Sequence, residues 1–546
     1  MDPIPPIKPD RNVFFFGSAD HWRQDLNAGL LVSLIALPLC LGIAVASGFP
    51  PMAGLITAIV GGVLVSWYKG SCLTITGPAA GLIVVILGSV ESLGEADDWA
   101  GYRYTLAAIV VSGGLQWLLG LFKAGRLAAF FPNSVVHGML AAIGIIIMAK
   151  QLPVMAGVEI ENHGLLTGLA RLPEALGFFI PQAAGIALVG LALLLAWPHV
   201  RHPMLSRIPA PLLVIVSGVL LGKVFDLRHL APEQYFRLPE GFSLGNSLLV
   251  SIPEDLTASL VLPDFARIGD VAFWGSVISI TLVGSLESLL STAAVDKLDP
   301  RKRYSDLNLD LRAIGMGNMA AGLLGGLPMI AEIARSSANI DAGGQTRWSN
   351  AFHGVFLLIF VVLLPNWIGA IPLASLAALL VYTGYRLASP LAFARTLDLG
   401  KEQLALFVIT IAGVLAGNLL AGVAIGILAK LLFHIGRGVS LRDLLSISYH
   451  VEPEAGNRWV VRVSGSAIFS NFVSLKSELA NLPPGGHIVF NLSEAGLIDH
   501  TVMEFIHQYR DDYIVQGGSC EILGLDQHTA YGPHAHSARN RPASNA

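Results

Sequence analysis

Charged residues are scarce in this sequence. Asp, Glu, Lys and Arg make up 13% of the 546 residues, whereas hydrophobic residues make up 53%; a soluble domain usually carries about 25% charged residues. The deficit lies between residues 28 and 436, where long apolar runs dominate. The net charge is −4 and basic residues do not cluster, so we expect no nucleic-acid partner. The composition indicates a chain embedded in a lipid bilayer, with polar ends.

Cysteine is nearly absent as well. The sequence contains only Cys40, Cys72 and Cys520, two in apolar segments and one in the polar C-terminal part. This number and spacing exclude a disulfide framework and a thiolate metal site. No nucleophile–base pair and no set of metal ligands stands out either. We therefore expect no enzymatic activity, no cofactor and no bound metal.

Apolar segments predict fourteen passages through the bilayer. A spanning helix needs roughly 20 mostly apolar residues, and twelve continuous candidates lie near 28–47, 52–68, 103–121, 134–150, 178–197, 209–223, 271–295, 307–324, 350–364, 369–385, 403–417 and 418–436. Two further segments, 73–91 and 327–341, are apolar but broken. An even number places both ends on one side, and Lys and Arg gather in the loops of that side. Since short cytoplasmic loops are enriched in these residues, both termini are expected in the cytoplasm.

The two broken segments start with glycine and proline. The first contains Thr76-Gly77-Pro78-Ala79-Ala80, and the second follows Gly325-Gly326. Each leaves about 12 residues for a helix, roughly half a bilayer at 1.5 Å per residue. They are third and tenth in order, so they match if the chain is a seven-plus-seven repeat. Because seven is odd, the halves must be inverted, and the two half-helix N-termini then face each other.

Facing N-termini predict an anion site. Interrupted segments in corresponding halves point to the binding site of a transporter, and helix N-termini attract negative charge. Arg335 in the second segment adds a positive charge, and ionisable residues inside the membrane are usually functional. The alternatives are a pair of kinked helices with structural glycines, and an Arg335 that pairs permanently with Glu332 or Glu287.

Two acidic residues accompany Arg335. Glu287 lies in the middle of the eighth span, where burial would raise its pKa, so it would carry a coupling proton; it would equally serve as the counter-charge of Arg335. The sequence alone leaves both roles open, and it assigns no role to Glu332. Asp296, near the cytoplasmic end of the eighth span, is interpreted as an interface residue rather than a cation ligand.

The polar C-terminal part reads as a small α/β domain. Strands are expected around 459–463, 488–492 and 520–523, with helices at 471–482 and 502–515 between them. Asp499-His500-Thr501 opens the second helix and is interpreted as its N-cap. Residues from about 526 onward are polar and predicted to be disordered; their histidines are too irregularly spaced to indicate a metal site.

Several short motifs make the chain similar to the SulP (sulfate permease) family. They are Ala36-Leu37-Pro38, Ala46-Ser47-Gly48, Ala53-Gly54-Leu55, Thr76-Gly77-Pro78, Glu287-Ser288-Leu289-Leu290-Ser291, Gly317-Asn318 and Gly325-Gly326. The resemblance extends over nearly the whole chain, and the C-terminal part resembles a STAS domain.

The resemblance implies a fold and a domain organisation. The fold would be an all-α polytopic membrane domain of fourteen segments in a seven-plus-seven inverted repeat (UraA-like), with a core moving against a gate, followed by a small α/β STAS domain. The domains would be a cytoplasmic N-terminal segment (1–25), the transport domain (26–437), the STAS domain (438–526) and a disordered tail (527–546). A homodimer in the plasma membrane of a bacterium, crossing it many times, is also implied.

The resemblance further implies a binding site between the third and tenth spans. Its members here would be Thr76, Gly77, Pro78, Ala79, Ala80, Ala334, Arg335 and Ser336, with Glu287 for coupling and Thr501 as a possible regulatory phosphorylation site. Sodium-coupled bicarbonate members have a neutral amide where Arg335 stands, which favours proton coupling or exchange here.

These observations lead to one functional hypothesis. The chain is expected to be a secondary transporter of a small inorganic oxyanion, sulfate or bicarbonate, working by alternating access. The alternatives are a dicarboxylate carrier and a passive anion (chloride) channel.

Overall fold

The computed structural model describes most of the chain. The described residues are 21–95, 97–125, 131–160, 165–175, 177–200, 202, 208–230, 242–244, 248–253, 256–417, 419–479, 482–483, 485–515 and 517–541. They divide into two compact units. Described residues of Arg11–Gly125 and Ile143–Leu387 form the larger unit, and those of Arg126–Ala142 and Ala388–Ala546 form the smaller unit.

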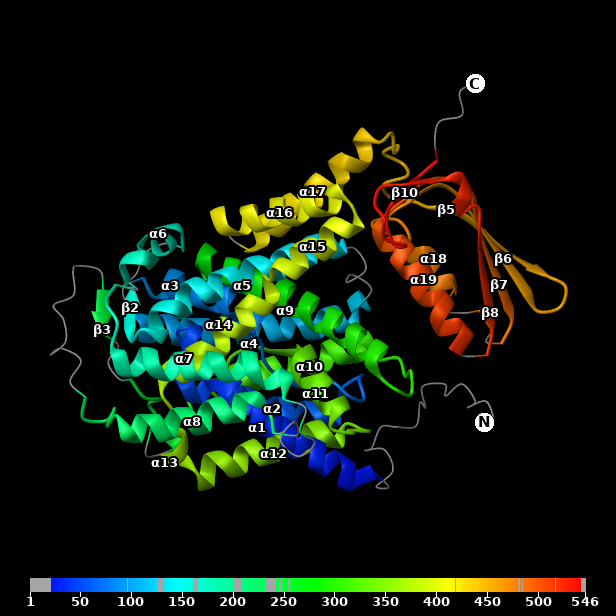
Figure 1. The fold of residues 1–546 in the computed structure, drawn as a ribbon. Coiled ribbons are helices and arrows are strands. Elements are labelled where there is room, and N and C mark those ends of the chain that lie inside the picture. The colour runs from blue at the N-terminus through cyan, green and yellow to red at the C-terminus, as the bar shows by residue number, and fades with distance from the viewer. Residues whose placement is uncertain are drawn as a thin grey trace. The chain divides into compact units, whose positions relative to one another are not determined.

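The larger unit is built mainly of helices (Figure 1). They are α1 (Trp22–Ala46), α2 (Pro51–Val63), α3 (Ile83–Gly94), α4 (Asp98–Leu121), the greater part of α5 (Asn133–Met155), α6 (Leu165–Ala175), α7 (Pro181–Ala196), α8 (Ala210–Val224), α9 (Val271–Leu298), α10 (Leu307–Leu323), α11 (Ile333–Asp341), α12 (Trp348–Leu363), α13 (Pro365–Ile368) and α14 (Leu373–Leu387). Short 3₁₀ turns η2 (Val65–Trp67), η3 (Ala80–Leu82), η5 (Trp197–His199) and η7 (Leu256–Ser259) lie between them. Two strand pairs complete the unit: β1 (Ile75–Pro78) with β4 (Met329–Glu332), and β2 (Val158–Ile160) with β3 (Phe242–Leu244).

Each of the fourteen predicted segments coincides with one of these helices or with α16 or α17 of the smaller unit. Among the described residues, seven helices are long and apolar enough to cross a membrane by length and composition: Trp22–Ala46, Asp98–Leu121, Asn133–Met155, Pro181–His199, Val271–Leu298, Leu373–Leu399 and Leu419–Gly436. Four shorter apolar helices accompany them. Helix length therefore supports a protein that crosses the membrane several times, while the total of fourteen stays a prediction. The sequence did not predict α6, α13 or α15.

Local signals explain where several helices begin. The Asp97 carboxylate accepts the N–H groups of Trp99 and Ala100 at 3.0 and 3.1 Å, which caps α4. Asp306 caps α10 in the same way through two N–H groups at 3.0 Å. Such side chains satisfy donors that a helix start leaves unpaired.

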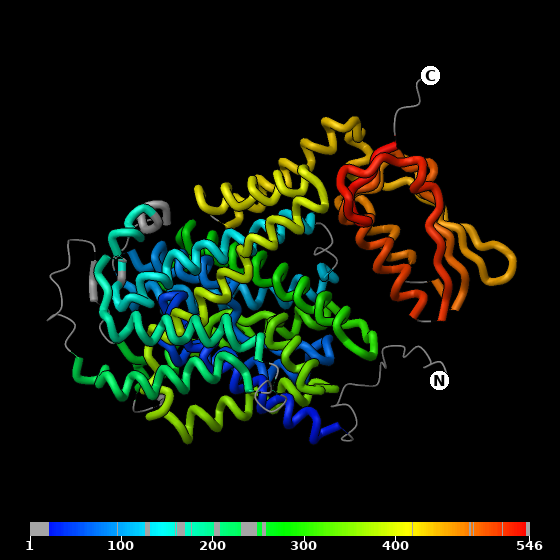
Figure 2. Tube along the Cα trace, viewed as in Figure 1, coloured from blue at the N-terminus to red at the C-terminus, as the bar shows by residue number. Residues whose placement is uncertain are grey.

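Glycines let the helices of the larger unit approach closely. A Cβ atom at Gly62 would lie 2.5 Å from the Cα of Gly354, where α2 meets α12. A Cβ atom at Gly113 would lie 2.7 Å from the Gly315 carbonyl, where α4 meets α10. Small residues at such crossings are the usual means of packing helices in membranes. Figure 2 shows α1 beside α12, although more than 300 residues separate them.

The smaller unit joins three helices to a sheet. The helices α15 (Pro390–Leu399), α16 (Lys401–Ala416) and α17 (Leu419–Gly436) are followed by β5 (Ser448–Glu454), β6 (Arg458–Ala467), α18 (Val473–Leu479), β7 (His487–Ile498), α19 (His500–Val515), β8 (Ser519–Leu523), the turn η8 (Leu525–Gln527), β9 (Thr529–Ala530) and β10 (Arg539–Asn540). β6, β7 and β8 run parallel, and β5 pairs antiparallel with β6. α18 and α19 lie on one face of this sheet (Figure 1), over a core that includes Val461, Phe490 and Ile506.

The three strands and two helices predicted here are present, but the edges differ from expectation. β5 was not predicted, and residues 527–541, which the sequence predicts to be disordered, are folded in the structure. The His528 ring contacts the carbonyl oxygens of Gly524 and Ala495 at 2.8 and 2.7 Å. β10 pairs with the last residues of β7, beyond the stretch that β8 covers. The polar composition of this segment predicts disorder. The segment is ordered because the last residues of β7 have a free edge, next to β8, that provides backbone hydrogen-bond partners for β10.

Candidate functional site

The structure brings the two broken segments together. β1 and β4 pair antiparallel, with Ile75 opposite Glu332 and Pro78 opposite Met329. β1 leads through η3 into α3, and β4 leads directly into α11. Because the strands are antiparallel, the two helices start at opposite ends of the pair and point away from each other. The strand rise of about 3.3 Å per residue separates the two helix starts by about 10 Å.

The outer edges of this strand pair are saturated by side chains of neighbouring helices. The N–H of Thr76 donates to Asn350 at 3.0 Å, and the N–H of Ala331 donates to Ser288 at 3.1 Å. Asn318 accepts the N–H of Met329 at 2.6 Å. Pro78 has no N–H to satisfy. These strand amides are therefore engaged within the protein, and the donors left for a ligand lie at the helix starts.

Both helix starts lack a capping side chain. Ala79 precedes η3 and Glu332 precedes α11, each in an extended conformation and neither making a side-chain cap hydrogen bond. The first N–H groups of a helix have no intrahelical partner. The helix dipole makes these groups a favourable place for negative charge.

Arg335 lies between the two helix starts. Its side chain is 1% exposed, and its Nη2 donates to the Pro78 carbonyl at 2.5 Å. Within the described part of the chain, Nε and Nη1 have no nitrogen or oxygen partner, and the buried Cys40 thiol interacts with the guanidinium. Among the described residues it forms no ion pair, so the alternative of a permanent pair with Glu332 or Glu287 is not what the structure shows. A buried guanidinium with two unused donors is available to an anion.

Two glycines make room for the charged groups. A Cβ atom at Gly77 would overlap Nη1 of Arg335, and a Cβ atom at Gly81 would overlap the carboxylate of Glu287. Arg335 therefore lies against β1, and Glu287 lies against the start of α3. Glu287 is 8% exposed, and its Oε2 has no hydrogen-bond partner in the described ranges. The half-buried Glu332 interacts with it electrostatically.

The other predicted site residues divide into two groups. Thr76 and Ser336 use their hydroxyl groups internally: Thr76 donates to Gly61 at 2.6 Å, and Ser336 accepts the Ile75 N–H at 2.8 Å. Ala79 and Ala80 are buried at the start of η3, and Ala334 is exposed in the first turn of α11.

Sequence reasoning missed four side chains that touch these segments. Asn318, Asn350 and Ser288 bind the strand backbone, and the buried Cys40 of α1 lies within the electrostatic reach of Arg335. Asn318 and Ser288 entered only as parts of family motifs. The signal that points to Asn318 is an amide side chain within an apolar span, where a polar group needs a partner.

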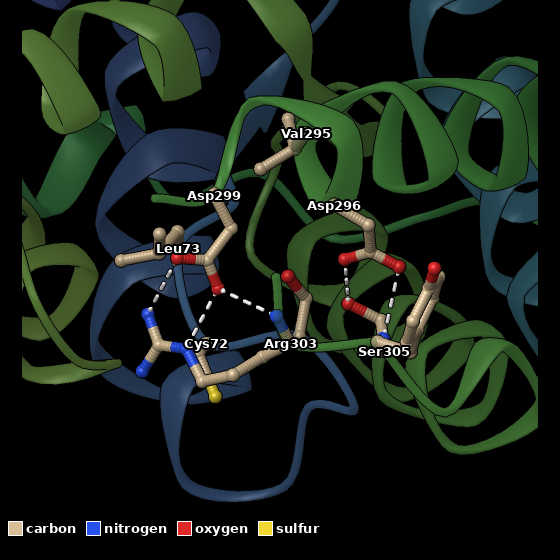
Figure 3. Close-up of a pocket in the computed structure, with 9 residues that line it drawn as sticks. Cys72, Leu73, Val295, Asp296, Asp299, Arg303 and Ser305 are labelled. Carbon is tan, nitrogen blue, oxygen red and sulfur yellow. Dashed lines mark hydrogen bonds and ion pairs between the residues drawn. The ribbon is translucent and has the colours of Figure 1, made fainter. Parts of the chain in front are cut away.

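The pocket in Figure 3 is lined by the segment that precedes β1, by the last turn of α9 and by the α9–α10 connection. The Asp296 carboxylate accepts the N–H and the hydroxyl of Ser305 at 2.9 and 2.6 Å. Asp299 forms an ion pair with Arg303 at 2.7 Å. Both carboxylates thus hold the connection in place, and the assignment of Asp296 as an interface residue stays a prediction.

In the smaller unit, Asp499 caps α19 as predicted. It accepts the N–H of Val502 at 2.9 Å and that of Phe469 at 2.8 Å. Burial opposes ionisation of Asp499, but hydrogen bonding to His434 and the charge of Lys430 hold its pKa below the ordinary value. Thr501 is half-buried in the first turn, and its phosphorylation stays a prediction.

Most of the chain matches one known protein family. The profile of the sulfate permease family matches residues 22–411. The chain belongs to the sulfate permease family. It is therefore a multi-pass membrane protein, in agreement with its apolar helices.

Sequence relatives come from several bacteria. The chain is 28% identical over 463 residues to the putative sulfate transporter YvdB of Bacillus subtilis, covering 84% of this chain and 82% of the relative. It is 27% identical over 371 residues to the bicarbonate transporter BicA of Picosynechococcus, covering 66% of this chain and 61% of the relative.

Solved structures share the fold. The transmembrane domain of a cyanobacterial bicarbonate transporter BicA matches with a TM-score of 0.63 at 22% identity, covering 76% of this chain and 98% of that chain. The structure of SLC26A9 matches with a TM-score of 0.67 at 15% identity, covering 92% of this chain and 84% of that chain.

Proposed function

We propose that this sulfate permease family member is a secondary active transporter of a small inorganic oxyanion, sulfate or bicarbonate. The observation that carries the proposal is the buried Arg335, whose two unused guanidinium donors lie between two uncapped helix starts. The anion would be held by backbone N–H groups at Ala79–Ala80 and Ala334–Ser336 together with Arg335. Sulfate and bicarbonate are the cargoes that the names of the relatives give.

The chemistry of these groups favours an oxyanion. A guanidinium presents planar N–H donors that match two oxygens of one anion. Each helix start adds backbone donors and about half a positive charge. A nucleobase would instead need neutral donors and acceptors along a ring edge, which this arrangement does not provide.

An inverted repeat is part of the proposal, and the helix contacts support it. α1 contacts α11 and α12, while α9 contacts α3 and α4. α2 contacts α12, while α10 contacts α4. Gly81 and Arg335 also occupy matching places, each three residues after its strand ends. Such exchanged contacts are what an inverted seven-plus-seven arrangement of fourteen spans predicts.

Several further features belong to the same proposal. Transport would proceed by alternating access, with Glu287 either carrying a proton or balancing Arg335 when no anion is bound. The protein would be a homodimer in a bacterial plasma membrane with both termini in the cytoplasm. The C-terminal sheet with α18 and α19 would be a STAS domain, and Thr501 would be its modification site.

Uptake by proteoliposomes containing Arg335→Ala tests the assignment. A hydrogen bond to a charged group contributes about 1.5–3 kcal/mol, so uptake at low anion concentration should fall about ten- to a hundredfold. Arg312→Ala is the matched control, because the guanidinium of Arg312, in α10, lies 5.9 Å from the ring centroid of Tyr68, which follows η2, and among the described residues it forms no hydrogen bond or ion pair with Arg335 or the strand pair. Undiminished and equally selective uptake by Arg335→Ala would refute the proposal.

The same preparation separates the rival functions. Labelled sulfate, bicarbonate, chloride and fumarate are compared in parallel, so a dicarboxylate carrier would be recognised by fumarate uptake. A passive chloride channel would give currents far above the turnover of a carrier in a planar bilayer.

A further inference from the structure

The strand pair β1–β4 has two outer edges that need hydrogen-bond partners. In an antiparallel pair, every second residue turns its N–H and C=O away from the neighbouring strand. The contacts identify the outward-facing residues as Thr76 and Pro78 on β1 and Met329 and Ala331 on β4. A backbone group left unpaired inside a membrane is costly. A wider sheet would satisfy these groups with a third strand, but among the described residues no third strand pairs with β1 or β4.

Asn318 takes the place of the third strand on β4. Its Oδ1 accepts the Met329 N–H at 2.6 Å, and its Nδ2 donates to the Met329 carbonyl at 3.3 Å. A facing strand residue makes the same exchange of two hydrogen bonds. Nδ2 also donates to Oε1 of Gln116 at 2.6 Å, which fixes the orientation of the amide. Both Asn318 and Gln116 are fully buried, so water does not compete for these bonds.

Asn318 and Arg335 hold the same cross-strand pair from opposite sides. Met329, which Asn318 binds, lies opposite Pro78 in the register. Pro78 in turn accepts the hydrogen bond from Arg335. The order across the ribbon is therefore Asn318, Met329, Pro78, Arg335. Met329 and Pro78 are each bonded covalently to the next cross-strand pair, Ile330 and Gly77, so a displacement of Met329 would be passed through that pair to the carbonyl that holds the guanidinium.

Asn350 binds the second outward-facing cross-strand pair, Thr76 with Ala331, in a comparable way. It accepts the Thr76 N–H at 3.0 Å and donates to the Gly61 carbonyl at 3.0 Å. Thr76 lies opposite Ala331, which is bound by Ser288 beside Glu287. Asn350 is as deeply buried as Asn318. However, the cross-strand pair that it binds, Thr76 with Ala331, is bound on its other side by Ser288 of α9 and not by Arg335.

We propose that Asn318 is a positioning residue of the anion site, standing in for a missing strand and fixing through Met329 and Pro78 the place of the Arg335 guanidinium. The inference rests on the proposed function, since it concerns the same site. Asn318 does not touch the anion; it acts through the backbone. Gln116 supports it by holding the amide in the orientation that binds both groups of Met329.

Anion binding by the purified full-length chain in detergent tests the proposal. The dissociation constant for labelled sulfate and for labelled bicarbonate is measured for wild type, Asn318→Ser, Asn350→Ser, Arg335→Lys and the two double variants with Arg335→Lys. Losing the Met329 hydrogen bonds should weaken binding by Asn318→Ser about tenfold, with Asn350→Ser weakened much less. Because Asn318 acts through Arg335, Asn318→Ser should weaken binding little further in the Arg335→Lys background. The effects of Asn350→Ser and Arg335→Lys should multiply.

A conservative variant guards against a folding defect. Asn318→Asp keeps the acceptor for the Met329 N–H, and rotation of the Gln116 amide would supply it with a donor. This variant keeps the bond to the Met329 N–H but loses the donor to the Met329 carbonyl, so it should recover part of the affinity lost in Asn318→Ser, and both should elute as single peaks in size exclusion.

The outcomes separate the two proposals. Wild-type affinity in Asn318→Ser, or losses that multiply between Asn318→Ser and Arg335→Lys, would overturn the positioning role while leaving the transport function intact. If Asn318→Ser fails to fold, Asn318→Asp takes its place in the test. A folded Asn318→Asp that does not recover the affinity, and whose loss multiplies with the loss caused by Arg335→Lys, would overturn the positioning role equally. A wild-type chain that binds neither anion would overturn the proposed function and the positioning role together.

Discussion

Gly81 and Arg335 stand at equivalent positions after their strands, but their side chains differ completely. At one helix start the chain supplies a guanidinium. At the other it supplies no side chain, and the space is taken by the Glu287 carboxylate from α9. The site is therefore charged asymmetrically, with a cation belonging to α11 and an acid facing α3. In the proposed transporter, this asymmetry would let an anion and a proton occupy one site without a permanent ion pair.

Substituting Gly81 tests the place of Glu287. A Cβ atom in Gly81→Ala would overlap the carboxylate, which is the free end of a flexible side chain and is able to shift. We expect the variant to fold and to transport, with a changed dependence of uptake rate on pH between about 5.5 and 8 if the carboxylate carries a coupling proton. Initial uptake rates in proteoliposomes measure this.

Gly88→Ala is the matched control for that experiment. It lies in α3, which continues from the turn η3 that contains Gly81, and no atom of the described residues lies within 4 Å of its added Cβ. Its pH profile should equal that of the wild type. An unchanged profile in Gly81→Ala as well would argue against coupling through Glu287.

At the scale of elements, the sequence predicted the broken segments but not how they are held. Glycine and proline mark where a helix cannot continue, and Arg335 is conspicuous because a charge is rare in an apolar run. The four-residue strands β1 and β4 are too short to leave a period in the sequence. Asn350 binds the backbone of Thr76, which is far away in the sequence, and Asn318 of α10 binds the backbone of Met329 in the strand that follows. The role of both residues is therefore visible only once the helices and strands are assembled.

The C-terminal segment shows a second element that the sequence did not reveal. Three histidine rings gather where it meets α19: His507 and His536 lie 5.0 Å apart, and His534 and His536 lie 4.8 Å apart between ring centroids. Burial, followed by the charges of Arg510 and His536, lowers the pKa of His507. Burial, followed by His534, lowers the pKa of His536. The acidic groups that face them, Asp511 and Glu504, act in the opposite direction.

This cluster predicts that the segment loosens in mild acid. A lowered pKa in the folded state means that the released segment binds more protons, so the docking of residues 529–540 is strongest above about pH 6.5 and weakens as the pH falls below that value. Hydrogen exchange of this segment, corrected for the intrinsic rate, should be slow at about pH 7.5 and faster at about pH 5.5.

Histidine variants identify the groups responsible. His536→Gln should reduce the pH dependence of exchange, because it removes the ring that contacts both others. His450→Gln, on the exposed edge strand β5, is the control and should leave it unchanged. Equal pH dependence in all three proteins would show that the histidines do not control docking.

At the scale of the whole molecule, the candidate site belongs to one compact unit. β1, β4, η3 and the helices α3, α9, α10, α11 and α12 all lie in the larger unit. The positions of the fourteen apolar segments could be predicted because hydropathy reports burial in lipid or protein directly. The division into units could not, because it depends on which faces meet each other, and hydropathy does not distinguish a face that meets lipid from a face that meets another apolar helix.

The larger unit should therefore carry the bound anion as one body, and a disulfide within it tests this. Ser112 of α4 and Thr281 of α9 are buried and hydrogen-bonded to each other at 2.9 Å. Side chains this close place two cysteines within the range of a disulfide. In a background where Cys72 and Cys520 are replaced by serine, the double variant Ser112→Cys and Thr281→Cys should oxidise readily and retain its uptake rate, because transport does not require α4 and α9 to separate.

The single Ser112→Cys variant controls for the substitution itself, and reduction of the double variant controls for oxidation. Uptake that stops on oxidation and returns on reduction would mean that these helices slide during the cycle, and the larger unit would then not be the moving body.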